Sequence, residues 1–384
     1  MSTTSKKTQS ERIFLSAPHM SGRELEYIRQ AFESNYIAPV GPQLNQFEKK
    51  FLETTGFNHC VAVTNGTSAI HLLLRTLGVG EGDVVLGSTL TFVGSVSPVS
   101  YQNAELVFID SDRETWNMDP NLLEQEIKWQ MDRGKKPAAV IPTELYGQPC
   151  DLDQIVDICQ AHDIPVICDS AESLGAKYKG QPVGRAARAA IFSFNGNKII
   201  TTSGGGMIAS DDQEIVKHCQ YLATQARQPV LHYDHHEIGF NYRMSNILAA
   251  IGIGQLEVLP DRVARKREIF SIYQQRLAEM PGVSMMPEAS FGESTRWLTV
   301  MLVDKDAFGA SPLDIIEALE AENIESRPVW RPLHLHKAFD NCRSVNGKFA
   351  ESLFEQGVCL PSGTAMTDSQ VDRVCNIISG LKKA

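Results

Sequence analysis

The sequence predicts an α/β protein with a mainly parallel central sheet and a smaller C-terminal α+β domain. Short apolar runs alternate with helical stretches between residues 59 and 210. Most of these runs are almost continuously apolar, as in strands that are buried on both faces of a sheet. A long helical stretch then leads to a shorter region that mixes strand and helix. This order indicates one large parallel-sheet domain followed by one small domain.

The large domain is expected to span residues 12–245. Its strands are expected at residues 60–63, 84–87, 106–109, 138–142, 165–168, 189–193 and 206–209. The helices between them are expected at residues 68–77, 121–132 and 153–162. Ligands bind such sheets at the carboxyl ends of the strands, so we expect the functional site there.

The rest of the chain divides into a tail, a connector and the small domain. Residues 1–11 are polar and are predicted to form a flexible tail, and a helix is expected to begin near Ser21. Residues 246–384 are expected to form the connector and the small domain. Their elements are expected to be one long helix over residues 245–280, a strand at 297–303, and helices at 312–322 and 368–381.

The composition excludes several classes of protein. The chain has 384 residues, is 42% hydrophobic and carries a formal net charge of −10. That charge argues against nucleic-acid binding, because a phosphate backbone requires a basic surface. No stretch approaches the roughly 20 apolar residues that span a bilayer, and the polar N-terminus lacks the apolar core of a signal peptide. We therefore expect a cytoplasmic protein that binds neither nucleic acid nor membrane.

No metal site is expected. The eight cysteines are scattered without a CxxC pair, which favours reduced, buried thiols over disulfides or zinc ligands. The run HYDHHE at residues 232–237 gathers three histidines, but it lacks a known ligand spacing.

A buried strand is predicted to end at Asp169, in the segment ICDSAESLGA (167–176). A carboxylate at that point is costly unless it has a cationic partner. It could cap a helix or turn. It could also keep the ring nitrogen of pyridoxal phosphate (PLP) protonated, which makes that cofactor an electron sink.

Lys198 follows another predicted strand, in the segment FSFNGNKIITTSGGGM (192–207). A lysine held among small residues near a strand end can be desolvated, and its amine then becomes nucleophilic. The alternative is an ordinary surface lysine in a turn. Because Asp169 and Lys198 each follow an apolar strand, the functional interpretation is favoured.

Two further segments carry polar groups at the start of a helix. In VTNGTSAIHLLL (63–74), a strand runs into a turn and then a helix that opens with Thr67 and Ser68. Such a helix start can bind an anion, or these residues can simply cap the helix. In GFNYRMSNILAAIG (239–252), Asn241 and Arg243 precede an apolar helix and could contact phosphate or substrate.

Together these segments resemble the DegT-type family of sugar-nucleotide aminotransferases. The motifs TNGTSA, DSAESLGA, SFNGNK and GFNYRMSNILAAIG occur in order and with suitable spacing, and the resemblance covers residues 12–380. It implies the aspartate-aminotransferase fold (PLP fold type I), PLP as cofactor and a homodimer with shared active sites.

The resemblance also implies roles for individual residues. Lys198 would carry PLP as a Schiff base, Asp169 would pair with the pyridine nitrogen, and Phe92 would stack on the ring. Further cofactor contacts are implied for Thr67, Ser68, Glu172, Ser193, Asn195 and, from the neighbouring subunit, Asn241. Many relatives have histidine or glutamine in place of Glu172, and a histidine near Asn195.

The substrate follows from similarity to one subgroup. AESLGA with SFNGNKIITTSGGGM, and IESRPVWRPLHLH at residues 324–336, resemble enzymes that aminate C4 of UDP-linked 4-keto-6-deoxy-N-acetylglucosamine in bacterial diaminotrideoxy-sugar biosynthesis. L-glutamate would be the amino donor. The expected substrate contacts are Arg243, Arg327, Trp330 and His334.

Alternatives remain open at this point. The acceptor could be GDP-4-keto-6-deoxymannose or a dTDP-linked 3- or 4-keto-6-deoxyhexose, and the protein could be a non-catalytic PLP-binding regulator. A PLP-dependent sugar dehydratase is disfavoured, because those relatives have histidine at the position of Lys198. An NAD-dependent sugar enzyme would need a glycine fingerprint after the first strand, which is missing.

Overall fold

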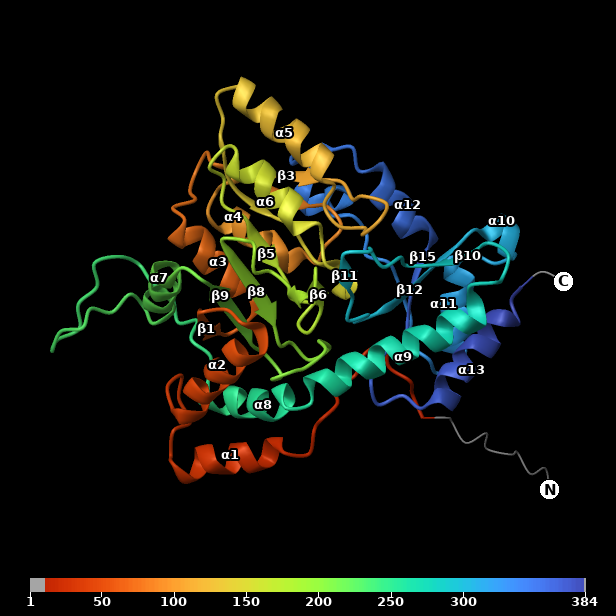
Figure 1. The fold of residues 1–384 in the computed structure, drawn as a ribbon, viewed down its shortest axis with the longest axis horizontal. Coiled ribbons are helices and arrows are strands. Elements are labelled where there is room, and N and C mark those ends of the chain that lie inside the picture. Colours follow the sequence, from red (N-terminus) through yellow and green to blue (C-terminus); the bar gives the residue numbers. More distant parts are fainter. Residues whose placement is uncertain (1–10, 383–384) are drawn as a thin grey trace.

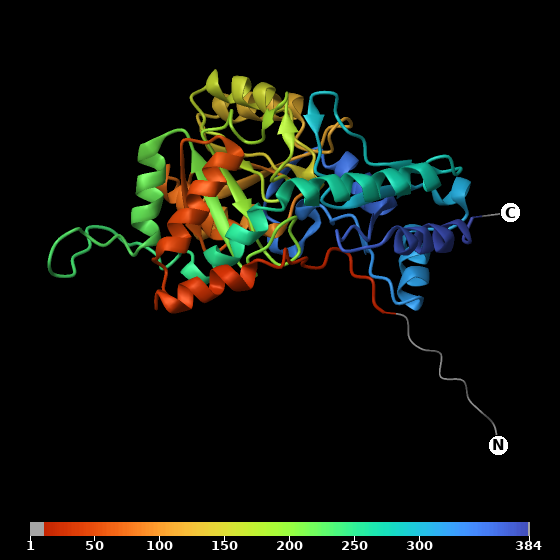
Figure 2. The same ribbon diagram turned by 60° about the horizontal axis from the view of Figure 1, so that its bottom comes forward.

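The computed structural model describes residues 11–382 (Figures 1 and 2). The predicted tail, residues 1–11, therefore lies outside the described residues except for Glu11. The chain forms a large α/β part and a smaller part, which are connected by a long helix that crosses Figure 1. No helix within residues 11–382 is long and apolar enough to cross a membrane.

The large part is built on a mainly parallel sheet, as predicted. Its strands are β1 (His59–Val63), β2 (Val84–Ser88), β3 (Glu105–Ile109), β4 (Pro137–Ile141), β5 (Ile167–Asp169), β8 (Ala189–Ser193), β9 (Gly206–Ser210) and β14 (Arg343–Val345). They pair in the orders β14-β3-β2-β4 and β5-β8-β9-β1. Parallel bridges from Val140 to Val166 and from Thr143 to Asp169 join the two groups. Strand β9 runs antiparallel to both of its neighbours.

Helices cover both faces of this sheet. One face packs against α3 (Gly66–Thr76), α4 (Ser97–Tyr101) and α7 (Gln213–Ala223). The other face packs against α2 (Pro42–Thr55), α5 (Pro120–Asp132), α6 (Leu152–Gln160) and α8 (Asn246–Leu256). In β2, Val85 belongs to the first core, whereas Val84 and Leu86 belong to the second. This alternation confirms that the apolar runs are strands buried on both faces.

The predicted single helix over residues 245–280 is wrong, because the chain forms two helices there. Helix α8 begins after Ser245, whose side chain accepts from the amide of Ile247, and ends at Leu256. The next helix, α9 (Leu259–Leu277), has Pro260 in its first turn. Proline has no amide hydrogen to donate to a preceding turn, so it starts a new helix here.

The small part combines an antiparallel sheet with helices. Its sheet has the order β10-β12-β15-β13, formed by β10 (Val283–Met285), β12 (Thr299–Val303), β15 (Gly357–Leu360) and β13 (Arg327–Pro328). Helices α9, α11 (Pro312–Ala321) and α13 (Asp368–Ser379) share its core with Ile13 from the N-terminal segment. The predicted boundary at residue 245 remains a prediction, and β14, from the C-terminal region, pairs with β3 of the large sheet.

The remaining α-helices and strands of the described residues are short or peripheral. They are α1 (Glu24–Glu33), α10 (Lys305–Phe308), α12 (Lys348–Gln356), β6 (Lys177–Tyr178), β7 (Gln181–Pro182) and β11 (Gly292–Glu293).

Candidate active site

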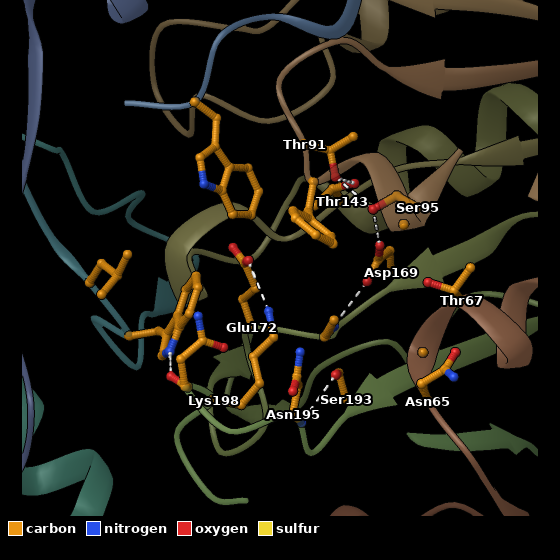
Figure 3. A pocket seen from close by; sticks show the side chains of 18 of the residues that line it. Asn65, Thr67, Thr91, Ser95, Thr143, Asp169, Glu172, Ser193, Asn195 and Lys198 are labelled. Atoms are coloured by element: carbon orange, nitrogen blue, oxygen red, sulfur yellow. Dashed lines mark hydrogen bonds and ion pairs between the residues drawn. The ribbon is translucent and has the colours of Figure 1, made fainter. Parts of the chain in front are cut away.

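A pocket lies where the carboxyl ends of β5 and β8 meet the start of α3 (Figure 3). The space it encloses, together with the part that is open to solvent, is about 1000 Å³. The large part contributes most of the lining, and the small part adds Trp297, Leu298, Arg327, Pro328, Trp330 and Cys359.

Asp169 ends β5 and points into this pocket (Figure 3). One carboxylate oxygen accepts from Ser95 Oγ at 2.5 Å, and the other accepts from the amide of Ala171 at 3.0 Å. Burial raises the pKa of Asp169 above its usual value, and these hydrogen bonds and the charge of Lys198 offset only part of that rise. Among the described residues, no cation lies within 4.0 Å of this carboxylate.

Three hydroxyl groups form a series of hydrogen bonds that ends at Asp169. The Oγ of Ser95 lies 2.8 Å from Thr91 Oγ1, which accepts from Thr143 Oγ1 at 2.9 Å. All three residues are buried. Because Ser95 donates to Asp169, this series of hydrogen bonds favours the ionised form of the carboxylate.

Lys198 lies on the loop after β8, across the pocket from Asp169 (Figure 3). Its Nζ donates to Glu172 Oε1 at 3.1 Å and lies 4.3 Å from the ring centre of Trp297. The side chain of Lys198 is 11% exposed, so it is screened from bulk water but still open to the pocket. The other carboxylate oxygen of Glu172 accepts from the amide of Tyr146 at 2.8 Å.

The start of α3 forms the opposite side of the pocket. Asn65 caps this helix by accepting from the amide of Ser68 at 2.7 Å. The first amides of a helix lack intrahelical partners, so those of Gly66 and Thr67 are available to an anion. A Cβ on Gly206 would lie 2.4 Å from the carbonyl carbon of Asn65, so only glycine allows β9 to pack this closely on the turn.

The comparisons with known proteins agree with this geometry. Residues 18–379 match the model of the DegT/DnrJ/EryC1/StrS aminotransferase family. The chain belongs to this family. It is therefore a sugar aminotransferase whose cofactor is PLP, and the predicted fold class is confirmed.

Three relatives illustrate the match. EpsN of Bacillus subtilis (strain 168), assigned as a PLP-dependent aminotransferase, is 50% identical over 96% of this chain and 95% of its own length. GDP-perosamine synthase of Caulobacter vibrioides is 35% identical over 94% of this chain and 96% of its own. Spr1654 of Streptococcus pneumoniae, assigned as a sugar aminotransferase and solved in its PLP form, has a TM-score of 0.87 at 28% identity, covering 97% of this chain and 98% of its own.

The site suits PLP on chemical grounds. Within residues 11–382 the buried carboxylate of Asp169 has no ion-pair partner, and a protonated pyridine nitrogen is a partner of the required charge. The first turn of α3 offers amides and the hydroxyl of Thr67 to a phosphate group.

The structure brings most of the predicted site residues together. The pocket is lined by Thr67, Phe92, Asp169, Glu172, Ser193, Asn195 and Lys198 of the predicted cofactor set, and by Arg327 and Trp330 of the predicted substrate set. Phe92 is 57% exposed and lies 5.8 Å, centre to centre, from the ring of Trp330.

Four predicted residues do not line this pocket within the single chain. The guanidinium of Arg243 forms an ion pair with Glu48 at 2.6 Å, and the ring of His334 lies between Thr89 and Glu351. The hydroxyl of Ser68 accepts from Thr64 at 3.0 Å, and Asn241 is exposed and itself forms an isolated antiparallel bridge with Thr224. Within the single chain other side chains occupy polar atoms of Arg243 and His334, and their substrate contacts remain predictions.

Sequence reasoning missed several residues of the site. Ser95 and Thr91 flank Phe92 in LTFVGS, and Thr143 follows β4, but a lone hydroxyl residue carries little signal in a sequence. Trp297 was predicted only as part of a strand, although its ring faces Lys198. Ligands bind parallel sheets at the carboxyl ends of the strands, and Thr143 follows the end of β4 as Asp169 ends β5. This rule could have indicated Thr143.

Proposed function

We propose that this aminotransferase moves an amino group from L-glutamate to C4 of a nucleotide-linked 4-keto-6-deoxyhexose, with Lys198 as the catalytic lysine. The observation that carries the proposal is the placement of Lys198 and Asp169 at the ends of neighbouring strands, facing one pocket.

Several residues of the pocket have a defined task under this proposal. PLP, when bound, supplies the electron sink for the amino transfer. Asp169 would hold a proton at the pyridine nitrogen, and the hydrogen bond from Ser95 favours the ionised form of Asp169. The amides of α3, Thr67 and Ser193 would bind the phosphate, and Phe92, which lines the same pocket, would cover one face of the ring.

Lys198 acts as general base and general acid. In the first half-reaction its Nζ would take the proton from the α-carbon of glutamate and pass it to C4′ of the cofactor. In the second half-reaction it would take a proton from that carbon and deliver it to C4 of the sugar. Glu172, 3.1 Å from Nζ, orients the amine and stabilises its cationic form between these transfers. Trp297 covers the amine from the side of the small part and excludes water.

Two sugar substrates fit this chemistry. Similarity to one subgroup of the family favours UDP-linked 4-keto-6-deoxy-N-acetylglucosamine. The 35% identity to GDP-perosamine synthase instead favours GDP-4-keto-6-deoxymannose. In both cases the mouth of the pocket offers Arg327 to a phosphate and Trp330 to a ring.

We also propose that a second copy completes the site. The segment between α7 and α8 leaves the body of the molecule as an extended arm (Figure 1). Leu231, Tyr233 and Ile238 on this arm are exposed apolar side chains, and Asn241 follows them. A homodimer would bury these side chains and place Asn241 at the partner's phosphate site.

The first test is an absorbance spectrum of the PLP-loaded protein. Glutamate is added first, and either keto-sugar is added in excess afterwards. A visible band that glutamate bleaches and one sugar restores would support the proposal and identify the nucleotide. Bleaching that neither sugar reverses would redirect the search to other nucleotide keto-sugars, such as the dTDP-linked ones. A band that glutamate leaves unchanged would contradict the proposal and favour a PLP-binding regulator.

A further inference from the structure

Lys266, on α9, is a buried lysine outside the pocket. Its Nζ donates to the carbonyl oxygens of Trp297 at 2.8 Å and Ser362 at 2.9 Å, and lies 3.4 Å from Ser16 Oγ. No charged side chain among the described residues offsets its burial. A buried lysine without a carboxylate is costly, so its local contacts indicate what its presence achieves.

The partners of Lys266 lead directly to the loop that carries Lys198. The backbone oxygen of Asn197 accepts from Trp297 Nε1 at 2.7 Å and from Ser16 Oγ at 3.0 Å. Lys266 therefore contacts both residues that hold this oxygen. The ring of Trp297 also lies 4.3 Å from Lys198 Nζ.

The same lysine joins other parts of the pocket wall. The amide of Ser362 donates to the backbone oxygen of Leu15 at 2.7 Å, and Ser362 Oγ accepts from the amide of Thr299 at 2.8 Å. Leu15 and Leu298 line the pocket. Lys266 thus connects the N-terminal segment, β12 and the end of β15 at one point.

We propose that Lys266 is a positioning residue of the aminotransferase, which fixes Trp297 and the backbone of Asn197 and thereby orients the amine of Lys198. The inference rests on the proposed role of Lys198. It assigns no chemistry to Lys266 itself, because its Nζ does not line the pocket.

The role does not depend on one protonation state. Burial lowers the pKa of Lys266 to about 7. Both the amine and the ammonium can donate to the two carbonyl oxygens, which are the shorter contacts.

The test compares Lys266→Met with Ile269→Ala. Methionine keeps an unbranched apolar chain but removes the donors. Ile269 lies on the same helix, is fully buried and belongs to the core of the small part, so its truncation loosens α9 without touching the pocket wall. Hydrogen exchange of the peptide containing residues 195–198 is measured in the cofactor-free proteins, and kcat and KM are measured after PLP loading.

We expect Lys266→Met to speed exchange in residues 195–198 and to lower kcat about tenfold or more with little change in KM, because small misplacements of a reacting group are costly. Ile269→Ala should lower the melting temperature without either change. Wild-type exchange and wild-type kcat in Lys266→Met would overturn the inference. So would equal changes in both variants, because they would indicate a purely structural role.

A second variant keeps the inference testable if Lys266→Met does not fold. Ser16→Ala removes one donor to Asn197 without altering charge, and it should produce the same changes at smaller size. Unchanged exchange in Ser16→Ala would then overturn the inference. The exchange measurement needs no turnover, so its failure is distinct from failure of the proposed function, which would appear as an active Lys198→Ala protein.

Discussion

Two lysines of this protein are largely buried, yet their surroundings differ in kind. Lys198 faces a pocket, is paired with the carboxylate of Glu172 and lies under the ring of Trp297. Lys266 lies in the junction of α9 with the pocket wall and contacts two backbone carbonyl oxygens and a serine hydroxyl. Burial alone therefore does not identify a catalytic lysine. The lysine that can do chemistry is the one whose amine has open space on one side.

The largest expected effect concerns the catalytic role of Lys198. Lys198→Ala is expected to lower turnover by about 10⁴-fold or more, because it removes both a nucleophile and a general acid–base group. The melting temperature should stay near that of the wild type. Initial rates and the visible spectrum of the PLP-loaded protein check this, with Lys179→Ala, an exposed lysine, as control. Activity within tenfold of wild type would end the assignment.

Asp169→Asn tests the other side of the same pocket. It keeps the size of the side chain but removes the negative charge opposite a ring nitrogen, so we expect about a 10²-fold loss of kcat. The visible band of bound PLP should also change its pH dependence. Asp153→Asn, a surface change, serves as control. An unaltered spectrum with unaltered kcat would show that Asp169 is a turn residue.

The buried environment of Lys266 predicts a pH dependence of stability. Its pKa is lowered to about 7 in the folded state, from 10.5. Between these values the unfolded chain binds more protons, so this group makes stability rise with pH. The burial of Lys266 destabilises the folded state, and this penalty should become smaller by about 2–3 kcal/mol from pH 7 to pH 9. The free energy of unfolding should rise by the same amount.

Denaturant unfolding of the wild type and Lys266→Met at both pH values measures this contribution. The rise should be smaller in the variant by that amount. A difference that is the same at both pH values would mean that Lys266 keeps its proton throughout, held by its oxygen partners.

The smallest expected effect concerns Glu172. Glu172→Gln keeps an acceptor for the amide of Tyr146 but removes the charge beside Lys198. Loss of one charge-assisted hydrogen bond should lower kcat about tenfold. Steady-state rates across pH check this, against Glu293→Gln, which removes an exposed ion pair with Lys177. A variant that matches wild type at every pH would make Glu172 a packing residue.

Much of the fold and the centre of the site could be predicted from the sequence. All seven predicted strands of the large domain are present, within two residues at either end, because buried strands leave a local apolar signal. Asp169 and Lys198 stood out because each follows such a strand. The break between α8 and α9 was missed, although Pro260 could have indicated it.

The sequence by itself indicated the seven strands of the large domain, the family through its motifs, and Asp169 and Lys198 as site candidates, because each of these leaves a pattern along the chain. Only the tertiary structure decided which polar residues face the pocket. Arg243 and His334 are held by Glu48 and Glu351, whereas Ser95 and Trp297 reach the site. Lys266 acquires its partners from segments 31, 96 and 250 residues away. Contacts between such distant segments leave no local pattern, so only packing shows them.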